Sequence, residues 1–197
     1  MKWGVLIWAL AVSPAGAFVT VYTDRTSFLE SLVQGFFADD FQSVVPGVAT
    51  PAMTRSGGGF TVQHTSPGFS VYGLSGGAIG SFNNGGGMQA TMTSVTVYAA
   101  GANFFYTDVN ELFAPGKLTI TLVQTGNTTI RDLMPTNATT GSFLGFVSDL
   151  PLTSLSVAAG GAGKFTTYDN FIVGVPEPVG GWLVVGAGTV WWGRRRR

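Results

Sequence analysis

The chain has 197 residues, with ten basic and ten acidic side chains, one histidine and no cysteine. The lack of cysteine excludes disulfides, thiol catalysis and thiolate metal sites. Without its two ends, residues 18–175 carry five basic and nine acidic side chains, a net charge of about −4. This balance argues against nucleic-acid binding, because that function requires a basic patch.

The first seventeen residues have the pattern of a secretory signal peptide. A positive start at Met1-Lys2 precedes an apolar run from Trp3 to Val12. Small residues at Ala15 and Ala17 then predict a cleavage site of the A-x-A kind. We therefore expect export through the Sec translocon, removal of residues 1–17 by signal peptidase, and a mature chain that begins at Phe18.

One short helix is predicted near the mature start. Five apolar residues at helical spacing share one face: Phe28, Leu29, Leu32, Val33 and Phe36. Asp24 or Ser27 can cap the first turn, Ser27 with Glu30 fits a capping box, and Gly35 can end the helix. We expect this helix to cover one open end or edge of the fold.

The remainder of residues 18–174 has a β composition, rich in Gly, Thr, Ser, Val and Phe. The clearest alternation runs from Lys117 to Leu122, where apolar residues face one side and threonines the other. Further strands are predicted at 60–64, 90–99, 103–107, 128–133, 142–147, 152–158 and 166–173. Turn signals separate these runs. The pattern predicts a single all-β domain over residues 18–174, an antiparallel β-sandwich or jelly roll.

The C-terminal tail has three parts in a fixed order. Val175-Pro176-Glu177-Pro178 is a turn that continues neither a helix nor a strand. An uncharged apolar stretch, residues 179–193, follows and is expected to form a transmembrane helix, although a full span usually needs about 20 residues. Four arginines, Arg194, Arg195, Arg196 and Arg197, close the chain and are expected to act as a membrane stop on the cytoplasmic side.

This tail resembles the PEP-CTERM sorting signal, which the membrane protease-transpeptidases called exosortases process. The resemblance rests on the Val-Pro-Glu-Pro turn, the apolar stretch and the terminal arginines of residues 175–197. It implies a Gram-negative-type bacterium, transient anchoring in the inner membrane and processing close to the Pro-Glu-Pro turn. The mature protein is then expected in the cell envelope or outside the cell.

The body also resembles the short β-sandwich domains that PEP-CTERM proteins carry. The similar segments are 23–28, 39–42, 103–108 and 168–171. Gln42 stands where that pattern has an acid. This second resemblance implies a fold and a location, and no reaction.

Oxygen-bearing side chains near the two ends of the domain are candidates for a calcium site. Four residues form the candidate set: Asp39, Asp40, Asp169 and Asn170. The first pair precedes an early strand and the second lies in the last strand, and these strands run side by side in jelly rolls. Asp108 or Glu111 can reach them from a loop, and calcium takes six to eight oxygen ligands. The alternative is that these residues are solvated acids or make turn-type hydrogen bonds to backbone.

Aromatic side chains are candidates for stacking on sugar rings. The strand at 103–107 carries three of them, Phe104, Phe105 and Tyr106, and neighbouring residues of a strand point to opposite faces. Tyr72, Phe82 and Tyr98 are further candidates. Core packing is the alternative for each of these rings.

No catalytic set is recognisable. His64 is the single histidine, no G-x-S-x-G motif is present, and nine scattered acids cannot be paired from the sequence. The sequence therefore favours a non-enzymatic exported protein with a structural or adhesive role linked to exopolysaccharide or biofilm. A calcium-stabilised carbohydrate-binding module and a secreted hydrolase are the alternatives.

Overall fold

The structure is a computed structural model that describes residues 18–32, 35–93, 96–126, 129–133 and 139–176. This part of the chain is all-β and antiparallel, with one short helix, as the composition predicts. Within the described ranges, no helix has the length and apolar character needed to cross a membrane. The predicted signal peptide and transmembrane stretch lie outside the described residues.

One helix, α1 (Arg25–Glu30), follows the first strand, and the remaining elements are strands. The first seven strands are β1 (Val19–Tyr22), β2 (Phe36–Asp39), β3 (Ala49–Thr50), β4 (Ala52–Gly57), β5 (Phe60–Thr65), β6 (Val71–Gly73) and β7 (Ile79–Ser81). The next seven are β8 (Met88–Met92), β9 (Val97–Thr107), β10 (Phe113–Ala114), β11 (Thr119–Gln124), β12 (Thr129–Leu133), β13 (Phe143–Val157) and β14 (Phe165–Gly174).

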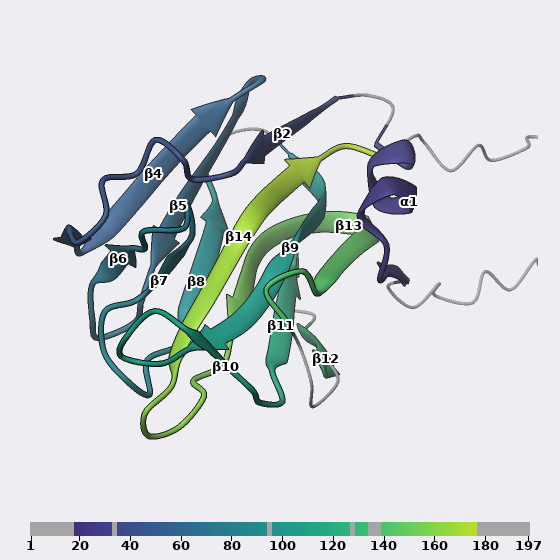
Figure 1. Ribbon diagram of the computed structural model, residues 1–197. Coiled ribbons are helices and arrows are strands. Elements are labelled where there is room, and N and C mark those ends of the chain that lie inside the picture. Colours follow the sequence, from purple (N-terminus) through teal and green to yellow (C-terminus); the bar gives the residue numbers. More distant parts are fainter. Residues whose placement is uncertain (1–17, 33–34, 94–95, 127–128, 134–138, 177–197) are drawn as a thin grey trace, which may run out of the picture.

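The strands form two packed layers of one continuous antiparallel sheet (Figure 1). Layer one contains β3, β6, β7, β14 and β9, together with β1, β2 and β10. Layer two contains β4, β5, β8, β11 and β12. The long strand β13 belongs to both, because residues 143–147 pair with β9 and residues 154–157 pair with β8.

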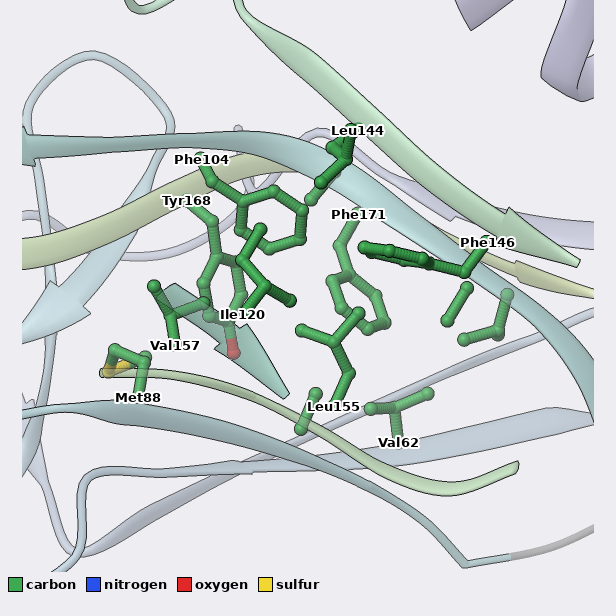
Figure 2. Close-up of a cluster of buried hydrophobic side chains, with 14 of the residues drawn as sticks. Val62, Met88, Phe104, Ile120, Leu144, Phe146, Leu155, Val157, Tyr168 and Phe171 are labelled. Atoms are coloured by element: carbon green, nitrogen blue, oxygen red, sulfur yellow. The ribbon is translucent and has the colours of Figure 1, made fainter. Parts of the chain in front are cut away.

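The main core lies between the layers. Figure 2 shows Phe104, Tyr168 and Phe171 of layer one facing Val62 and Met88 of layer two. The alternation predicted around Lys117–Leu122 is confirmed, because Leu118, Ile120 and Leu122 are buried and Thr119 and Thr121 are only partly buried.

Two predicted strand boundaries are wrong. The run predicted at 90–99 contains the end of β8 and the start of β9, which are separate strands. The runs predicted at 142–147 and 152–158 belong to one strand, β13, of 15 residues. Asp149-Leu150-Pro151 has the composition of a turn, yet here it lies where β13 passes from one layer into the other. Local composition therefore indicates a bend and does not show that the strand continues.

Helix α1 is shorter than predicted, and its cap is Asp24. The Asp24 carboxylate accepts hydrogen bonds from the backbone N–H and the hydroxyl of Ser27, both at 2.8 Å, and these bonds lower the pKa of Asp24. Ser27 lies inside the helix, so the predicted capping box with Glu30 does not form. The Phe28 ring packs on Phe143, with ring centroids 5.4 Å apart.

The helix covers the β1 end of layer one, on the face turned away from layer two. A small second core forms there from Phe28, Leu32, Ala99, Phe143 and Ile172. We call this side of layer one its outer face. Helix α1 lies at one end of layer one, whereas β6, β7 and β10 lie away from it (Figure 1).

Candidate functional site

A pocket of about 280 Å³ lies on the outer face of layer one, at the end away from α1. This volume is just below the usual range for small-molecule sites, which is about 300–1,000 Å³. The lining residues come from β6, β7, the end of β9, the loop after it and the start of β14: Tyr72, Leu74, Gly80, Ser81, Phe82, Thr107, Asp108, Val109, Glu111, Phe165 and Thr167.

Strand pairing builds the floor of the pocket. Gly80 of β7 pairs with Tyr72 of β6 on one side and with Thr167 of β14 on the other, so the three residues lie in one row on the outer face. The hydroxyl oxygens of Thr107 and Thr167 lie 3.1 Å apart and are buried. A Cβ at Gly80 would lie only 3.0 Å from the Thr167 hydroxyl oxygen. Glycine at this position therefore keeps the floor open.

Two aromatic rings form a wall of the pocket. The ring centroids of Tyr72 and Phe82 are 5.8 Å apart, and the ring planes are tilted by 53°. Phe82 is 51% exposed, which is a large fraction for a phenylalanine side chain. These rings give the pocket an apolar surface that solvent can reach.

An acidic loop, residues 108–112, contributes Asp108, Val109 and Glu111 to the lining of the same pocket. The Asp108 carboxylate accepts hydrogen bonds from the backbone N–H groups of Asn110 and Leu112, at 2.8 and 3.0 Å, and so folds the loop into a tight turn. Glu111 has a φ of 62°, in the left-handed region that is uncommon for residues other than glycine. Strained backbone of this kind is found frequently at binding sites.

The Glu111 side chain fastens this loop to the opposite wall. One carboxylate oxygen accepts a hydrogen bond from the Tyr72 hydroxyl at 3.0 Å. The other accepts from the Ser75 backbone N–H at 2.9 Å and from its hydroxyl at 2.6 Å. The hydrogen bonds from Ser75 lower the pKa of Glu111 most, and the hydrogen bond from Tyr72 lowers it further. The hydrogen bond between Tyr72 and Glu111 also raises the pKa of Tyr72. Glu111 is therefore an ionised hydrogen-bond acceptor at neutral pH.

The predicted calcium candidates lie elsewhere on the sheet. As expected, the strand that carries Asp39 runs beside the last strand, and Asp39 is paired with Phe171. However, Asp39 ends β2 and does not precede a strand. Its buried carboxylate accepts two hydrogen bonds from the Arg55 guanidinium of β4 and one from the Phe41 backbone N–H. The Asp40 carboxylate accepts from the Gln42 backbone N–H.

Asp169 and Asn170 form an irregularity in β14. Asn170 has a φ of 51°, and its side-chain amide donates to the Asp169 carboxylate at 2.8 Å. Burial is the main reason that the pKa of Asp169 is raised, and the charges of Asp40 and Asp39 add to it. In the described ranges, no three His, Cys, Asp or Glu side chains gather as a metal site. Asp108 and Glu111 belong to the pocket loop.

The predicted stacking residues are buried. The exposed fractions of Phe104, Phe105 and Tyr106 are 0%, 5% and 2%. Phe104 and Phe105 point to opposite faces as predicted, since Phe104 is in the main core whereas Phe105 packs with Leu74 and Ala78. None of the three offers an exposed stacking platform, and the core-packing alternative holds for all of them.

The sorting motif lies only in part within the described residues. The Val175 backbone N–H donates to the Gly35 carbonyl at 3.2 Å, and its side chain packs against the main core. Pro176 is the last residue described. Glu177 and Pro178, the four arginines Arg194–Arg197, and the cleavage residues Ala15 and Ala17 lie outside the described residues.

Sequence reasoning identified parts of this pocket but did not combine them. It named Tyr72 and Phe82 as stacking candidates, and Asp108 and Glu111 as acids that could reach a calcium site. Nothing local to residue 111 indicates Ser75 as its partner, because the two are 36 residues apart in the chain.

No family model matches this chain, and no curated protein matches it. Among solved structures, a family 29 carbohydrate-binding module is similar at 15% identity and a TM-score of 0.36, over 64% of this chain and 88% of that one. A family 11 carbohydrate-binding module from Clostridium thermocellum, in complex with a β-1,3-1,4-mixed-linked tetrasaccharide, is similar at 12% identity and a TM-score of 0.26. That similarity covers 72% of this chain and 96% of the module. At these TM-scores the likeness assigns neither a fold family nor a ligand to this chain.

Proposed function

We propose that this chain is an exported, non-catalytic carbohydrate-binding protein of the cell surface or extracellular matrix. The observation that carries the proposal is the pocket in which the tilted ring pair of Tyr72 and Phe82 stands beside the ionised carboxylate of Glu111. Sugar rings have apolar C–H faces and hydroxyl groups on their rims. An aromatic wall and a fixed carboxylate suit these two features together.

The state of Glu111 favours binding over hydrolysis. A glycoside hydrolase needs a carboxylic acid that is still protonated at the working pH, and enzymes obtain it by raising the pKa of that group. The pKa of Glu111 is lowered, because its oxygens accept hydrogen bonds from Ser75 and Tyr72. A hydrogen-bonded carboxylate of this kind is suited to orient a hydroxyl group. It is poorly suited to donate a proton.

The two chain ends support the location. The signal peptide at residues 1–17 and the PEP-CTERM-like tail at residues 175–197 would carry the domain across the inner membrane and present it to an exosortase. A sugar-binding domain delivered in this way would act as an adhesive element of an exopolysaccharide layer or biofilm. This destination rests on the sequence resemblance.

A glycan microarray followed by titration calorimetry tests the binding. The full chain, purified in a mild detergent because of its apolar tail, should bind at least one class of neutral oligosaccharide. Phe82→Ala should weaken that binding at least tenfold, about 1.4 kcal/mol. Phe36→Ala is the matched control, since Phe36 is 44% exposed on β2 and does not line the pocket.

Two outcomes would overturn the proposal. One is the absence of binding to any glycan. The other is glycan binding that Phe82→Ala leaves unchanged, which would remove the pocket from the function. Release of shorter products from a bound oligosaccharide would instead support the hydrolase alternative.

The intact mass of the protein recovered from the cell surface tests the processing. The expected mass lacks residues 1–17 and the segment after the Pro-Glu-Pro turn. A mass that still includes Arg194–Arg197 would rule out exosortase processing. An attached group would appear as added mass and would show whether the processed protein is covalently anchored.

A further inference from the structure

We infer that the pocket prefers sugar rings that carry a free, protonated amino group over neutral or N-acetylated rings, and that it rejects uronic acids. This inference rests on the proposed carbohydrate binding at the same site and adds the substrate class. It follows from the charge of the pocket lining, the partners of Glu111 and the aromatic wall.

Among the described residues that line the pocket, two carry a carboxylate, Asp108 and Glu111. None of these described lining residues is Lys, Arg or His. Lys164 is next to Phe165 in the chain but does not line the pocket. Its ammonium group donates to the Pro115 carbonyl at 2.6 Å and lies 5.6 Å from the centroid of the Tyr106 ring. Arg55 is engaged with Asp39. The lining of the pocket is therefore net negative.

The negative charge of Glu111 is held in place but not neutralised by its described partners. All three donors to its carboxylate, the Tyr72 hydroxyl and the two groups of Ser75, are uncharged. These donors lower its pKa, so that the charge persists through the physiological range. These hydrogen bonds therefore fix the position of the carboxylate. A fixed acceptor favours selective binding of a charged donor.

The aromatic wall adds to the same preference. The faces of aromatic rings carry negative potential and attract cations within about 6 Å. Tyr72 contacts both partners, because its ring packs against Phe82 and its hydroxyl donates a hydrogen bond to the Glu111 carboxylate. An ammonium group bound here would meet a ring face and a carboxylate together. A carboxylate group would be repelled by Asp108 and Glu111.

The chemistry separates the sugar classes. In a hydrogen bond from a hydroxyl to a carboxylate only the acceptor is charged, whereas an ammonium donor also brings a positive charge, so Coulomb attraction adds to the hydrogen bond. N-acetylation removes the charge and adds bulk. We therefore expect an oligomer of glucosamine to bind about tenfold more tightly than the same oligomer of N-acetylglucosamine, and an oligomer of galacturonic acid to show no binding.

Titration calorimetry with four oligosaccharides of equal length tests this: glucosamine, N-acetylglucosamine, glucose and galacturonic acid oligomers. The experiment uses the full chain at a slightly acidic pH that keeps the amino groups protonated. The preference for the glucosamine oligomer should shrink as salt is raised, because exposed charges are screened. These titrations use the unmodified protein, so their outcome does not depend on whether a variant folds.

Glu111→Gln should weaken binding of the glucosamine oligomer about tenfold more than binding of the neutral oligomers, and so remove the preference, because the variant lacks the negative charge. The Gln oxygen can still accept hydrogen bonds from Ser75, and the Gln amide can donate to the Tyr72 hydroxyl oxygen, so the loop stays attached. Glu30→Gln is the matched control, since Glu30 is exposed on α1 and does not line the pocket. Equal affinities for the glucosamine and N-acetylglucosamine oligomers, or tighter binding of galacturonic acid, would overturn the inference and leave the proposed function intact. Absence of binding to all four oligomers would overturn the inference, and absence of binding on the glycan microarray as well would overturn the proposed function.

Discussion

Nδ1 of His64 lies 2.6 Å from the hydroxyl oxygen of Tyr168, and this hydrogen bond joins the two layers across the core. His64 comes from β5 in layer two, and Tyr168 comes from β14 in layer one. Both side chains are fully buried. Phe171 packs edge-on against the imidazole, with centroids 5.0 Å apart. Burial lowers the pKa of His64 from 6.5 to about 3, so the ring is neutral in the folded protein.

Because His64 is buried in its neutral form, we expect the free energy of unfolding to fall in mild acid. On unfolding, His64 regains its ordinary pKa of 6.5, so the unfolded chain binds the proton first. The stabilising contribution is therefore complete above pH 6.5 and is lost as the pH falls towards 3, by up to about 1.4 kcal/mol per pH unit. Urea unfolding should show a free energy about 2 kcal/mol lower at about pH 5 than at about pH 7.5.

His64→Phe provides the control for this prediction. The chain has one histidine, so the variant removes the group that titrates in this window. It leaves the Tyr168 hydroxyl without its partner and should cost about 1–3 kcal/mol at neutral pH. The difference between the two pH values should nearly vanish. A pH dependence equal to that of the unmodified protein would contradict the assignment.

The ion pair between Asp39 and Arg55 ties β2 of layer one to β4 of layer two. The Asp39 carboxylate is 5% exposed and accepts hydrogen bonds from two guanidinium nitrogens of Arg55. Arg55→Leu should lower the free energy of unfolding by about 2–3 kcal/mol, because it leaves a buried carboxylate without its cation. Denaturant unfolding measures the change. Asp39→Asn combined with Arg55→Leu should recover part of the loss, and a double variant less stable than Arg55→Leu would argue against the pair.

Substitution of Gly80 tests sterically whether ligands reach the pocket floor. An added Cβ would lie 3.0 Å from the Thr166 carbonyl oxygen and 3.3 Å from Leu74 Cδ1. Gly80→Ala should therefore weaken glycan binding about tenfold and lower stability by about 1 kcal/mol. Gly76→Ala is the control, since a Cβ there meets nothing within 4 Å. Unchanged glycan affinity in Gly80→Ala would show that ligands do not reach the floor.

Calcium at Asp39, Asp40, Asp169 and Asn170 stays a prediction, and thermal unfolding tests it. Bound calcium would raise the melting temperature in proportion to the logarithm of its concentration, and a chelator would reverse the rise. Asp40→Asn should then abolish the effect, since the Asp40 carboxylate accepts only a backbone hydrogen bond among the contacts described and is exposed. A melting temperature that calcium leaves unchanged would remove the metal from this protein's chemistry.

The sequence by itself determined the local features. Leu118, Ile120 and Leu122 alternate with polar residues, and a side-chain period of two needs no partner to define a face. The cap of α1 is likewise local, because Asp24 and Ser27 are three residues apart. The opposite orientations of Phe104 and Phe105 follow from the same alternation. For such features, neighbouring residues in the chain set the geometry.

Only the tertiary structure decided which surfaces are covered and where the pocket lies. Phe105 points away from the main core, yet Leu74 and Ala78 bury it, and both come from the segment between β6 and β7. Glu111 contributes to a binding wall because β6, β7, β14 and β9 pair side by side and bring Ser75 within 2.9 Å of it. Strand pairing depends on contacts between distant residues, which alternation within one strand does not encode. The sequence therefore predicted an exported β domain, and the pairing of its strands made the pocket.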